Sequence, residues 1–264
     1  MSRPLLLRLT PKKFRAALWM RLYRSSAASR PELYRNAKLA YAPQVSMDLV
    51  PGDVVSGCIA YTGLWERRIT ERVMKIARQG GTFVDVGANL GYYSLLWAAA
   101  HPENKGYAFE ASPRVYPLFL RNLERNGFSN RVKTYQLAAG AQAGQLPFEV
   151  GPADEHGWGG LAKTKTANTM LVDVVRVDEI LNEPIELLKI DVEGAEPWVL
   201  EGCTRLFERR LIRQIIFEEN KSRSKQLGLE PAKSRELLKQ FGFQVTPLGD
   251  PDKDLDWLAT LDGK

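Results

Sequence analysis

The sequence predicts an α/β fold in which a mostly parallel sheet is covered by helices on both faces. From Thr82 onward, short apolar runs typical of strands alternate with longer segments at helical spacing. Such alternation favours parallel strands joined by crossover helices. The chain has 264 residues, of which 44% are hydrophobic and 26% charged, so it is long enough to bury the core of such a fold.

The individual elements follow in order along the chain. Residues 44–62 alternate apolar and polar side chains around the turn pair Pro51-Gly52, which predicts short strands, and residues 64–79 have helical spacing. We then expect strands at 82–86, 106–110, 132–137, 186–190 and 214–218, and helices at about 90–100, 113–126, 195–208 and 231–241. A hairpin-like stretch is expected at about 146–175, and a closing antiparallel pair at 243–247 and 257–261.

The net charge of +6 is concentrated at the N-terminus. Residues 1–40 contain ten Lys and Arg against one acid, Glu32, whereas the rest of the chain has 27 basic and 30 acidic residues. Because the charge is local and no basic surface interleaved with aromatic residues follows, the pattern argues against a nucleic-acid partner.

The same basic segment has apolar side chains at helical spacing, namely Phe14, Ala17, Leu18 and Leu22. We therefore divide the chain into a basic helical arm, residues 1–43, and a main domain, residues 44–264. The arm either lies on an anionic membrane or a partner, or packs on its own domain and exposes a solvated basic face. The second alternative is favoured, because short amphipathic helices usually pack on cores.

Cysteine usage and hydropathy indicate the compartment. The two cysteines, Cys58 and Cys203, give no disulfide framework, and two histidines exclude a His-rich metal site. No run approaches the roughly 18 apolar residues of a membrane-spanning helix. The segment Leu5–Leu7 is too short for a signal-peptide core. The sequence predicts a cytoplasmic protein, with membrane association through residues 1–40 as an alternative.

A glycine-rich bend follows the first regular strand, in the stretch V-D-V-G-A-N-L-G-Y-Y-S at 84–94. In parallel sheets, ligands bind beyond the carboxyl ends of the strands. Gly87 suits a tight turn there, and Gly91 lets the next helix approach the sheet and any ligand. Asp85 ends the strand, and Glu110, at the end of the next strand, can accept both hydroxyls of a ribose. These features predict a ligand that contains a nucleoside.

The loop chemistry favours one kind of nucleoside. A dinucleotide site requires G-x-G-x-x-G, but Asn89 and Tyr92 stand where that pattern has its second and third glycines. Asp85 would also repel a pyrophosphate. A ligand with an amino-acid head fits better, because its ammonium and sulfonium charges attract carboxylates, and S-adenosylmethionine has these features. The alternative is a tight strand-to-helix turn without a ligand.

A second acidic stretch, L-L-K-I-D-V-E-G-A-E-P-W, covers Leu187–Trp198. Its apolar strand places Asp191 at the carboxyl edge of the sheet, where a donor and an acceptor would meet, and Glu193 follows two residues later. Glu196 suits the first turn of the next helix, where a negative charge complements the helix dipole.

Four segments in this order resemble the FkbM family of class I methyltransferases: F-V-D-V-G-A-N-L-G-Y-Y-S at 83–94, F-E-A-S-P at 109–113, V-R-V-D-E-I-L at 175–181 and L-K-I-D-V-E-G-A-E at 188–196. The preceding G-L-W-E at 63–66 also fits, so the resemblance covers about residues 44–245. It implies a Rossmann-like class I methyltransferase fold with a seven-stranded sheet. It also implies S-adenosylmethionine as methyl donor and O-methylation of a hydroxyl on a sugar, glycan or natural-product small molecule.

The resemblance also implies roles for individual residues. Asp85, Gly87, Asn89 and Gly91 would line the methionine part of the donor and Glu110 the ribose. Ala111 and Ser112 would border the adenine, with Leu137-Ala138 on its other side. The complete expected donor site consists of Asp85, Gly87, Ala88, Asn89, Gly91, Tyr92, Glu110, Ala111, Ser112 and Ala138.

Two residues are candidates for the base that accepts the proton of a hydroxyl acceptor. Asp191 is the first, and His156, in a glycine-rich stretch between strands, is the second. Mg²⁺ is an alternative requirement, because some related sugar O-methyltransferases hold it with acids after the fourth and fifth strands. Asp191, Glu218 and Glu219 would be its ligands here.

Two other functions remain open at this point. One is a catalytically silent S-adenosylmethionine-binding module or partner subunit. The other is a nicotinamide oxidoreductase, which shares the ribose-binding acid but is disfavoured by Asn89 and Tyr92.

Overall fold

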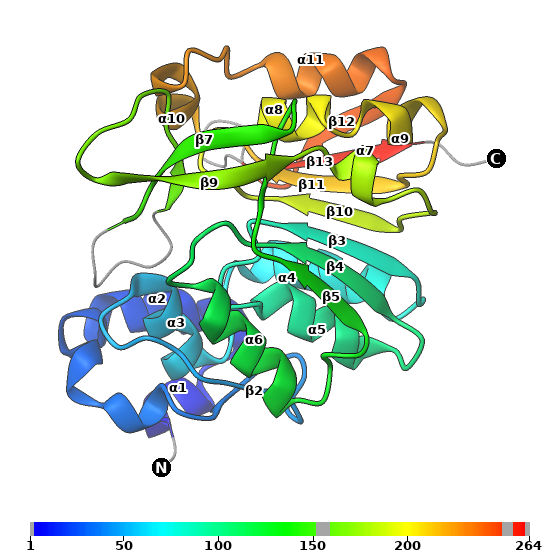
Figure 1. The fold of residues 1–264 in the computed structure, drawn as a ribbon. Helices are drawn as coiled ribbons and strands as arrows, with labels where there is room; N and C mark the ends of the chain where they lie inside the picture. The colour runs from blue at the N-terminus through cyan, green and yellow to red at the C-terminus, as the bar shows by residue number, and fades with distance from the viewer. Residues whose placement is uncertain (1–2, 152–158, 250–255, 262–264) are drawn as a thin grey trace.

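The computed structural model describes residues 3–151, 159–249 and 256–261. A large sheet lies at its centre (Figure 1). The strands of this sheet are β3 (Thr82–Val86), β4 (Lys105–Phe109), β5 (Val132–Tyr135), β10 (Leu187–Ile190), β11 (Gln214–Glu218), β12 (Phe243–Pro247) and β13 (Asp256–Leu261). Their spatial order is β12-β13-β11-β10-β3-β4-β5, which confirms the predicted seven-stranded sheet.

The pairing within the sheet is mostly parallel. Strand β3 pairs in parallel with β4 on one side and with β10 on the other, and β5 and β11 continue the parallel part. Strand β13 runs antiparallel to both β11 and β12, as predicted for the closing pair. The strand order reverses between β3 and β10, so their carboxyl ends form the place where such sheets bind ligands.

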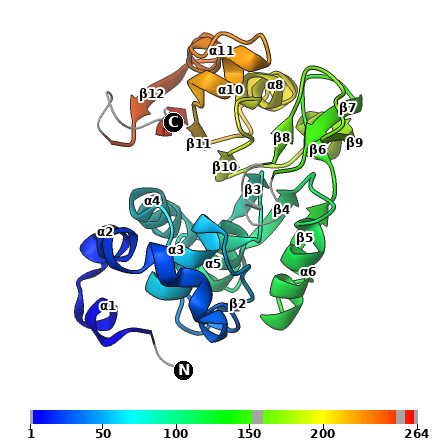
Figure 2. The same ribbon diagram turned by 90° about the vertical axis from the view of Figure 1, so that its left-hand side faces the viewer.

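Helices cover both faces of the sheet (Figures 1 and 2). The α-helices are α1 (Leu5–Leu9), α2 (Lys12–Leu22), α3 (Val54–Thr62), α4 (Arg67–Ala77), α5 (Tyr92–Ala100), α6 (Tyr116–Arg125), α7 (Val177–Ile180), α8 (Glu196–Glu201), α9 (Thr204–Glu208), α10 (Lys221–Gln226) and α11 (Lys233–Gln240). Two 3-10 helices, η1 (Arg24–Ser29) and η2 (Pro31–Leu33), follow α2. Helices α4, α5 and α6 lie on one side of the sheet, and α8 and α11 on the other.

Two smaller sheets complete the fold. Strands β1 (Ala37–Lys38) and β2 (Ser46–Met47) form an antiparallel pair. A four-stranded sheet has the order β6-β9-β7-β8, with β6 (Ala138–Ala139), β7 (Gly144–Glu149), β8 (Gly160–Leu161) and β9 (Thr169–Val175). Strands β7 and β9 pair antiparallel along their length, which confirms the hairpin-like stretch predicted there.

The prediction of short strands across residues 44–62 is wrong for most of that segment. Only Ser46–Met47 is a strand within it, and residues 54–62 form α3. Asp53 caps this helix, because its side chain accepts a hydrogen bond of 2.7 Å from the N–H of Ser56. Gly63 ends it in the left-handed conformation, with φ of 81°. These two end signals outweigh the alternation of apolar and polar residues between them.

The single helix predicted at 195–208 is also wrong, since α8 ends at Glu201 and α9 begins at Thr204. The break coincides with a close approach to the loop after β6. A Cβ atom on Gly202 would lie 2.2 Å from the carbonyl oxygen of Gly140. Helix α10 was not predicted, although Asn220 caps it by accepting a hydrogen bond from the N–H of Arg223.

The N-terminal helices pack on the rest of the chain, as the favoured alternative predicted. Trp19 of α2 is 1% exposed and belongs to the same hydrophobic core as β3 and α5. Gly57 of α3 makes this possible, because a Cβ atom there would lie 2.9 Å from the Trp19 ring. The division at residue 43 stays a prediction. Within the described residues, no helix has the length and hydropathy to cross a membrane.

Candidate active site

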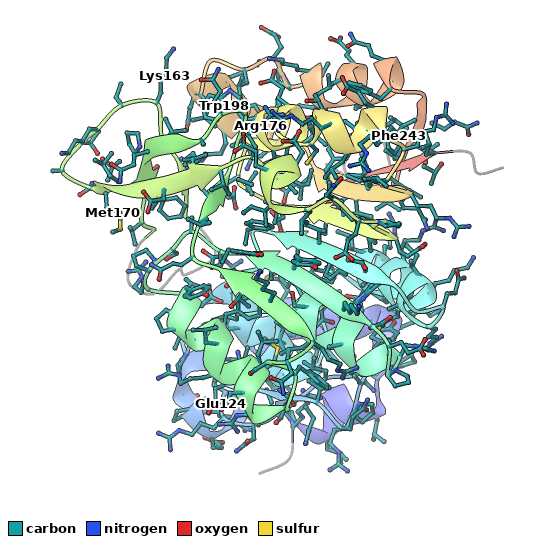
Figure 3. All side chains as sticks on the ribbon, turned by 45° about the vertical axis from the view of Figure 1, so that its right-hand side comes forward. Glu124, Lys163, Met170, Arg176, Trp198 and Phe243 are labelled. Atoms are coloured by element: carbon teal, nitrogen blue, oxygen red, sulfur yellow. The ribbon has the colours of Figure 1, made fainter. Side chains whose placement is uncertain are left out.

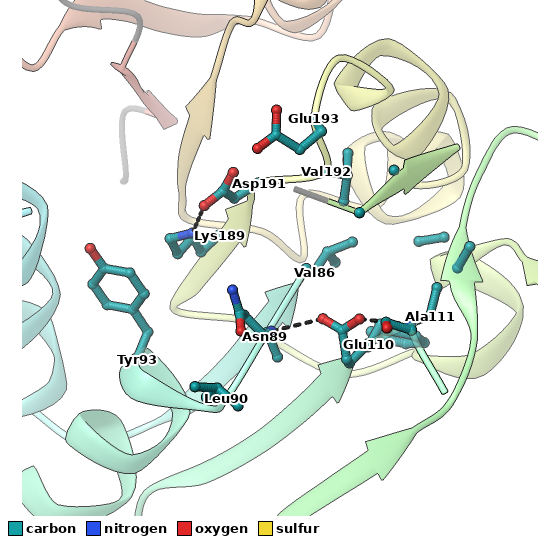
Figure 4. A pocket seen from close by; sticks show the side chains of 18 of the residues that line it. Val86, Asn89, Leu90, Tyr93, Glu110, Ala111, Lys189, Asp191, Val192 and Glu193 are labelled. Atoms are coloured by element: carbon teal, nitrogen blue, oxygen red, sulfur yellow. Dashed lines mark hydrogen bonds and ion pairs between the residues drawn. The ribbon is translucent and has the colours of Figure 1, made fainter. Parts of the chain in front are cut away.

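A cavity opens at the carboxyl ends of β3, β4, β10 and β11, beside the point where the strand order reverses (Figure 4). It encloses about 1180 Å³ of space free of protein atoms, part of it open to solvent. The β3–α5 loop, the segment after β4 and the four-stranded sheet form three of its sides. Val55 and Ile59 of α3 also line it, one helical turn apart. The cavity therefore lies where α/β sheets of this kind bind their ligands.

The β3–α5 loop is held in place by backbone contacts and by glycine. The N–H groups of Gly87 and Ala88 both donate to the carbonyl oxygen of Phe109, at 2.9 and 3.0 Å. Gly87 has φ of 81°, and a Cβ atom on it would lie 1.8 Å from the carbonyl oxygen of Asp191. Glycine is therefore required where the loops after β3 and β10 cross.

Glu110 joins two walls of the cavity through its carboxylate (Figure 4). One oxygen accepts the N–H of Asn89 at 2.8 Å, and the other accepts the N–H of Ser112 at 2.7 Å. Each carboxylate oxygen has a further lone pair that faces no protein donor in these bonds. Burial raises the pKa of Glu110 to about 7. This carboxyl is thus positioned to accept hydroxyl groups of a ligand.

Most of the predicted donor site lines the cavity. The residues found on its wall are Gly87, Ala88, Asn89, Tyr92, Glu110, Ala111, Ser112 and Ala138. Two predicted residues are absent from it. Asp85 is 1% exposed and accepts a hydrogen bond of 2.7 Å from Ser94, below the cavity. Gly91 serves packing, because a Cβ atom there would lie 2.3 Å from the Phe119 ring.

Lys189 and Asp191 form the charged floor of the cavity (Figure 4). The Lys189 ammonium is 2.9 Å from an Asp191 oxygen and 4.8 Å from the centre of the Tyr93 ring. Burial alone would lower the pKa of Lys189, but Asp191, Glu66 and Asp85 together raise it, so the lysine stays charged. Burial would raise the pKa of Asp191, and its contacts with Lys189 outweigh this and lower it.

The three predicted metal ligands do not come together. Glu218 lies in the cavity and shares a hydrogen bond with Asp191, and burial followed by the charge of Asp191 raises its pKa. Glu219 is 2% exposed and pairs with Arg235 at 2.9 Å, outside the cavity wall. The Asp191 carboxylate, which a metal ion would need as a ligand, is already paired with the Lys189 ammonium. The described residues contain no group of three or more suitable side chains that could hold a metal ion, so they give the magnesium prediction no support.

Glu66 is a functional candidate that the sequence reasoning did not single out. It lies at the start of α4, with φ of 38°, a conformation that non-glycine residues rarely adopt. Its carboxyl lines the cavity and accepts a hydrogen bond of 2.8 Å from Tyr93. Burial, followed by the charge of Asp191, raises the pKa of Glu66 to about 7. Only its place in the G-L-W-E segment hinted at it.

His156, the second candidate base, lies outside the described residues. The described ends of that segment, Gly151 and Gly159, show where it leaves and rejoins the fold. Gly159, Gly160 and Leu161 line the cavity, and a Cβ atom on Gly160 would lie 3.1 Å from the Cβ of Glu193. The candidate base His156 therefore stays a prediction.

Comparison with known proteins agrees with this architecture. The family model of the methyltransferase FkbM domain matches residues 85–245, more than half of the chain. Methyltransferase sdnD of Sordaria araneosa is 32% identical over 198 residues, which are 62% of this chain and 73% of that protein. Methyltransferase 1 of Beauveria bassiana (strain ARSEF 2860) is 30% identical over 142 residues, 45% of this chain and 57% of that protein.

A solved structure shows the same fold at low identity. The delta-N METTL16 methyltransferase domain has a TM-score of 0.51 and 13% identity, with 90% of this chain and 97% of that chain covered. The matched region 85–245 begins inside β3 and contains β4, β10 and β11, the strands whose ends build the cavity. This chain is a member of the FkbM methyltransferase domain family.

Proposed function

We propose that the protein transfers the methyl group of S-adenosylmethionine to a hydroxyl oxygen of a sugar, glycan or natural-product small molecule. The observation that carries this proposal is the arrangement of carboxyl groups in the cavity. Glu110 faces the donor side between two loops, and Glu66 stands across the cavity beside the Lys189–Asp191 pair. Glu110 is placed to bind the ribose hydroxyls, and Glu66 is placed to accept the proton of the methyl acceptor.

The donor side matches the chemistry of this ligand. Glu110 offers lone pairs to the ribose hydroxyls. Leu137, Ala138 and Phe109 supply apolar surface for the adenine. The carboxylates around Lys189 provide negative charge near the sulfonium and ammonium groups. Asp85 contributes to this field from below the wall, through its contact with Ser94 and its charge interaction with Lys189.

The transfer itself requires alignment and removal of one proton. The donor supplies a methyl group on a positive sulfur, and its transfer to oxygen breaks a carbon–sulfur bond and forms a carbon–oxygen bond. A cavity that holds the acceptor oxygen in line with this methyl group supplies much of the rate. The hydroxyl proton then needs a base whose pKa lies near the working pH.

Glu66 fits that task better than Asp191. Its pKa of about 7 means that near neutral pH the carboxyl is partly ionised and still basic enough to take a proton. The lowered pKa of Asp191 makes its carboxylate a weaker base, and its ion pair with Lys189 would be lost on protonation. In this proposal Asp191 holds Lys189 and Glu218 in place, while Glu66 receives the proton.

The test is turnover of Glu66→Gln, measured as S-adenosylhomocysteine formed with a panel of hydroxyl compounds, each paired with its deoxy analogue. We expect product only with the hydroxyl compounds. The substitution should reduce kcat roughly 10²- to 10⁴-fold with little change in donor affinity. In the wild type, kcat should rise with pH through about 7, because the base must be ionised. The variant should lack that rise.

Glu193→Gln is the matched control, since Glu193 also lines the cavity but accepts a hydrogen bond from Asn220. It should change turnover little. Loss of the pH-dependent rise in Asp191→Asn instead of Glu66→Gln would assign the base to Asp191. Donor binding without product on any hydroxyl compound would favour the silent binding module.

A further inference from the structure

Exposed apolar side chains are concentrated on the two N-terminal helices. Among the described residues, nine large hydrophobic side chains are exposed, and six of them come from α1 and α2. These six are Leu5, Leu6, Leu9, Phe14, Met20 and Leu22, and we call the exposed side chains of α1 and α2 together the α1–α2 surface. Leu9 is 75% exposed and Leu5 is 64% exposed, so the core does not account for these side chains.

The same two helices are basic and contain no acid. Residues 3–31 contain eight Lys and Arg, and the first acid along the chain is Glu32. Arg8, Lys13 and Arg21 are exposed beside the apolar side chains, and the Lys13 ammonium lies 4.8 Å from the centre of the Phe14 ring. Long cationic side chains next to exposed leucine and phenylalanine fit the boundary between lipid headgroups and acyl chains.

The α1–α2 surface is fixed to the body of the protein. Leu7 of α1 and Trp19 of α2 are each 1% exposed and anchor the two helices in the core. Arg3, just before α1, donates hydrogen bonds to the carbonyl oxygens of Ala60 and Ile59 at the end of α3. Both helices are therefore already folded on the body of the protein, and their exposed side chains are available for binding.

We propose that the α1–α2 surface binds an anionic lipid surface. Its charge has one sign and complements anionic headgroups, and its exposed leucine, phenylalanine and methionine side chains offer apolar contacts to the lipid beneath the headgroups. Helix α2 packs on α3 (Figure 2), and Val55 and Ile59 of α3 line the cavity. One helix thus separates the proposed lipid-binding surface from the active site, and an acceptor held at a membrane would lie close to the cavity.

Vesicle co-sedimentation tests the proposal on the full chain. We expect binding to vesicles of phosphatidylcholine mixed with phosphatidylserine, at least roughly tenfold weaker binding to phosphatidylcholine alone, and weakening by added salt. Binding of equal strength to both vesicle types, or to neither, would overturn the proposal.

Two variants separate the apolar and the basic contributions. Leu6→Ser/Leu9→Ser/Phe14→Ser should lose most vesicle binding, because it removes the inserted side chains. Arg8→Glu/Lys13→Glu/Arg21→Glu should lose it through charge reversal, at roughly fivefold or more per residue. Neither variant alters the buried anchors Leu7 and Trp19, and thermal unfolding checks that each remains folded. A folded variant that keeps full binding would contradict the proposal.

The matched control lies on the four-stranded sheet. Met170 and Leu171 of β9 are 37% and 48% exposed, and Lys163, in the loop between β8 and β9, is exposed as well (Figure 3). Met170→Ser/Leu171→Ser/Lys163→Glu should bind vesicles like the wild type.

Light scattering without lipid tests whether a second copy of the chain covers the α1–α2 surface instead. A wild-type oligomer that the Leu6→Ser/Leu9→Ser/Phe14→Ser variant dissociates would make this surface an interface between copies of the chain and overturn the proposal. Vesicle binding is measured without a methyl donor or acceptor, so its result does not depend on whether the protein shows the proposed methyl transfer.

Discussion

At the scale of single residues, Gly87 determines whether the loops after β3 and β10 can cross. Its φ is 81°, and a Cβ atom added to it would lie only 1.8 Å from the Asp191 carbonyl oxygen, so there is no room for a side chain. Gly127 has a similar φ of 69° but no atom within 4 Å of its Cβ position. Comparing alanine substitutions at Gly87 and Gly127 therefore separates the free-energy cost of a left-handed backbone from the cost of steric overlap.

We expect Gly127→Ala to lower the free energy of unfolding by about 1–2 kcal/mol, the cost of a left-handed conformation. Gly87→Ala should lower it by at least about 3 kcal/mol, because overlap adds to that cost. Chemical denaturation measures both. Equal losses in the two variants would mean that the crossing relaxes and that Gly87 is required only for its φ.

The residue scale also shows what the sequence could predict. Gly87 and Glu110 followed from their places after two apolar strands, because strand ends of a parallel sheet share one edge. Asp85 shares a sheet face with Lys189, its register partner, but its carboxylate accepts a hydrogen bond from Ser94 and does not line the cavity; its role in donor binding stays a prediction. Glu66 was missed because no spacing rule connects it to Asp191, 125 positions later in the sequence.

At the scale of elements, α2 depends on its contact with α3. Trp19→Ala should lower the free energy of unfolding by about 3–5 kcal/mol, because it leaves a cavity against Gly57. Phe14→Ala on the same helix should change it by no more than about 0.5 kcal/mol, since Phe14 is 54% exposed. Denaturant unfolding measures both, and a small effect of Trp19→Ala would mean that α2 contributes little to the fold.

Element prediction succeeded where periodicity and end signals agreed. The strands at 82–86 and 214–218 have the predicted bounds, and both are flanked by clear changes in pattern. In 44–62 the two kinds of signal conflicted, and the caps Asp53 and Gly63 gave the better guide. In this segment the alternation of apolar and polar residues predicts the secondary structure poorly, because packing on α2 stabilises α3 as a helix.

At the scale of the whole molecule, buried carboxyls make stability depend on pH. Burial raises the pKa of Glu196 and of Glu110 to about 7, from 4.5. The folded state thus keeps protons that the unfolded state has lost, so this stabilisation is complete below pH 4.5 and is lost as pH rises through about 7.

Between these pH values, the free energy of unfolding should fall with rising pH, by up to about 1.4 kcal/mol per pH unit for each such group. Glu196→Gln cannot titrate, so its decline should be shallower than that of the wild type. Denaturant unfolding across this range measures both slopes. A wild-type stability that rises from pH 5 to pH 7.5 contradicts the assignment.

The topology of the large sheet was accessible from the sequence, whereas only the hairpin-like part of the four-stranded sheet was. Alternating strands and helices, with the resemblance to a known family, led to the seven-stranded sheet and its closing antiparallel pair. The four-stranded sheet depends on β6, which is two residues long, and on its pairing with β9 across a long separation in sequence. Neither leaves a periodic signal. This sheet nonetheless forms one side of the cavity.

Binding of S-adenosylmethionine in the cavity is tested most directly by calorimetric titration with S-adenosylhomocysteine, with NAD as the control. We predict saturable binding of S-adenosylhomocysteine and none of NAD. Glu110→Gln should weaken the former roughly tenfold or more, because one acceptor oxygen facing the ribose becomes a donor. Glu124→Gln on the exposed side of α6 should bind like the wild type (Figure 3). Binding of NAD in preference, or no binding of S-adenosylhomocysteine, would contradict the assignment of this cavity to S-adenosylmethionine.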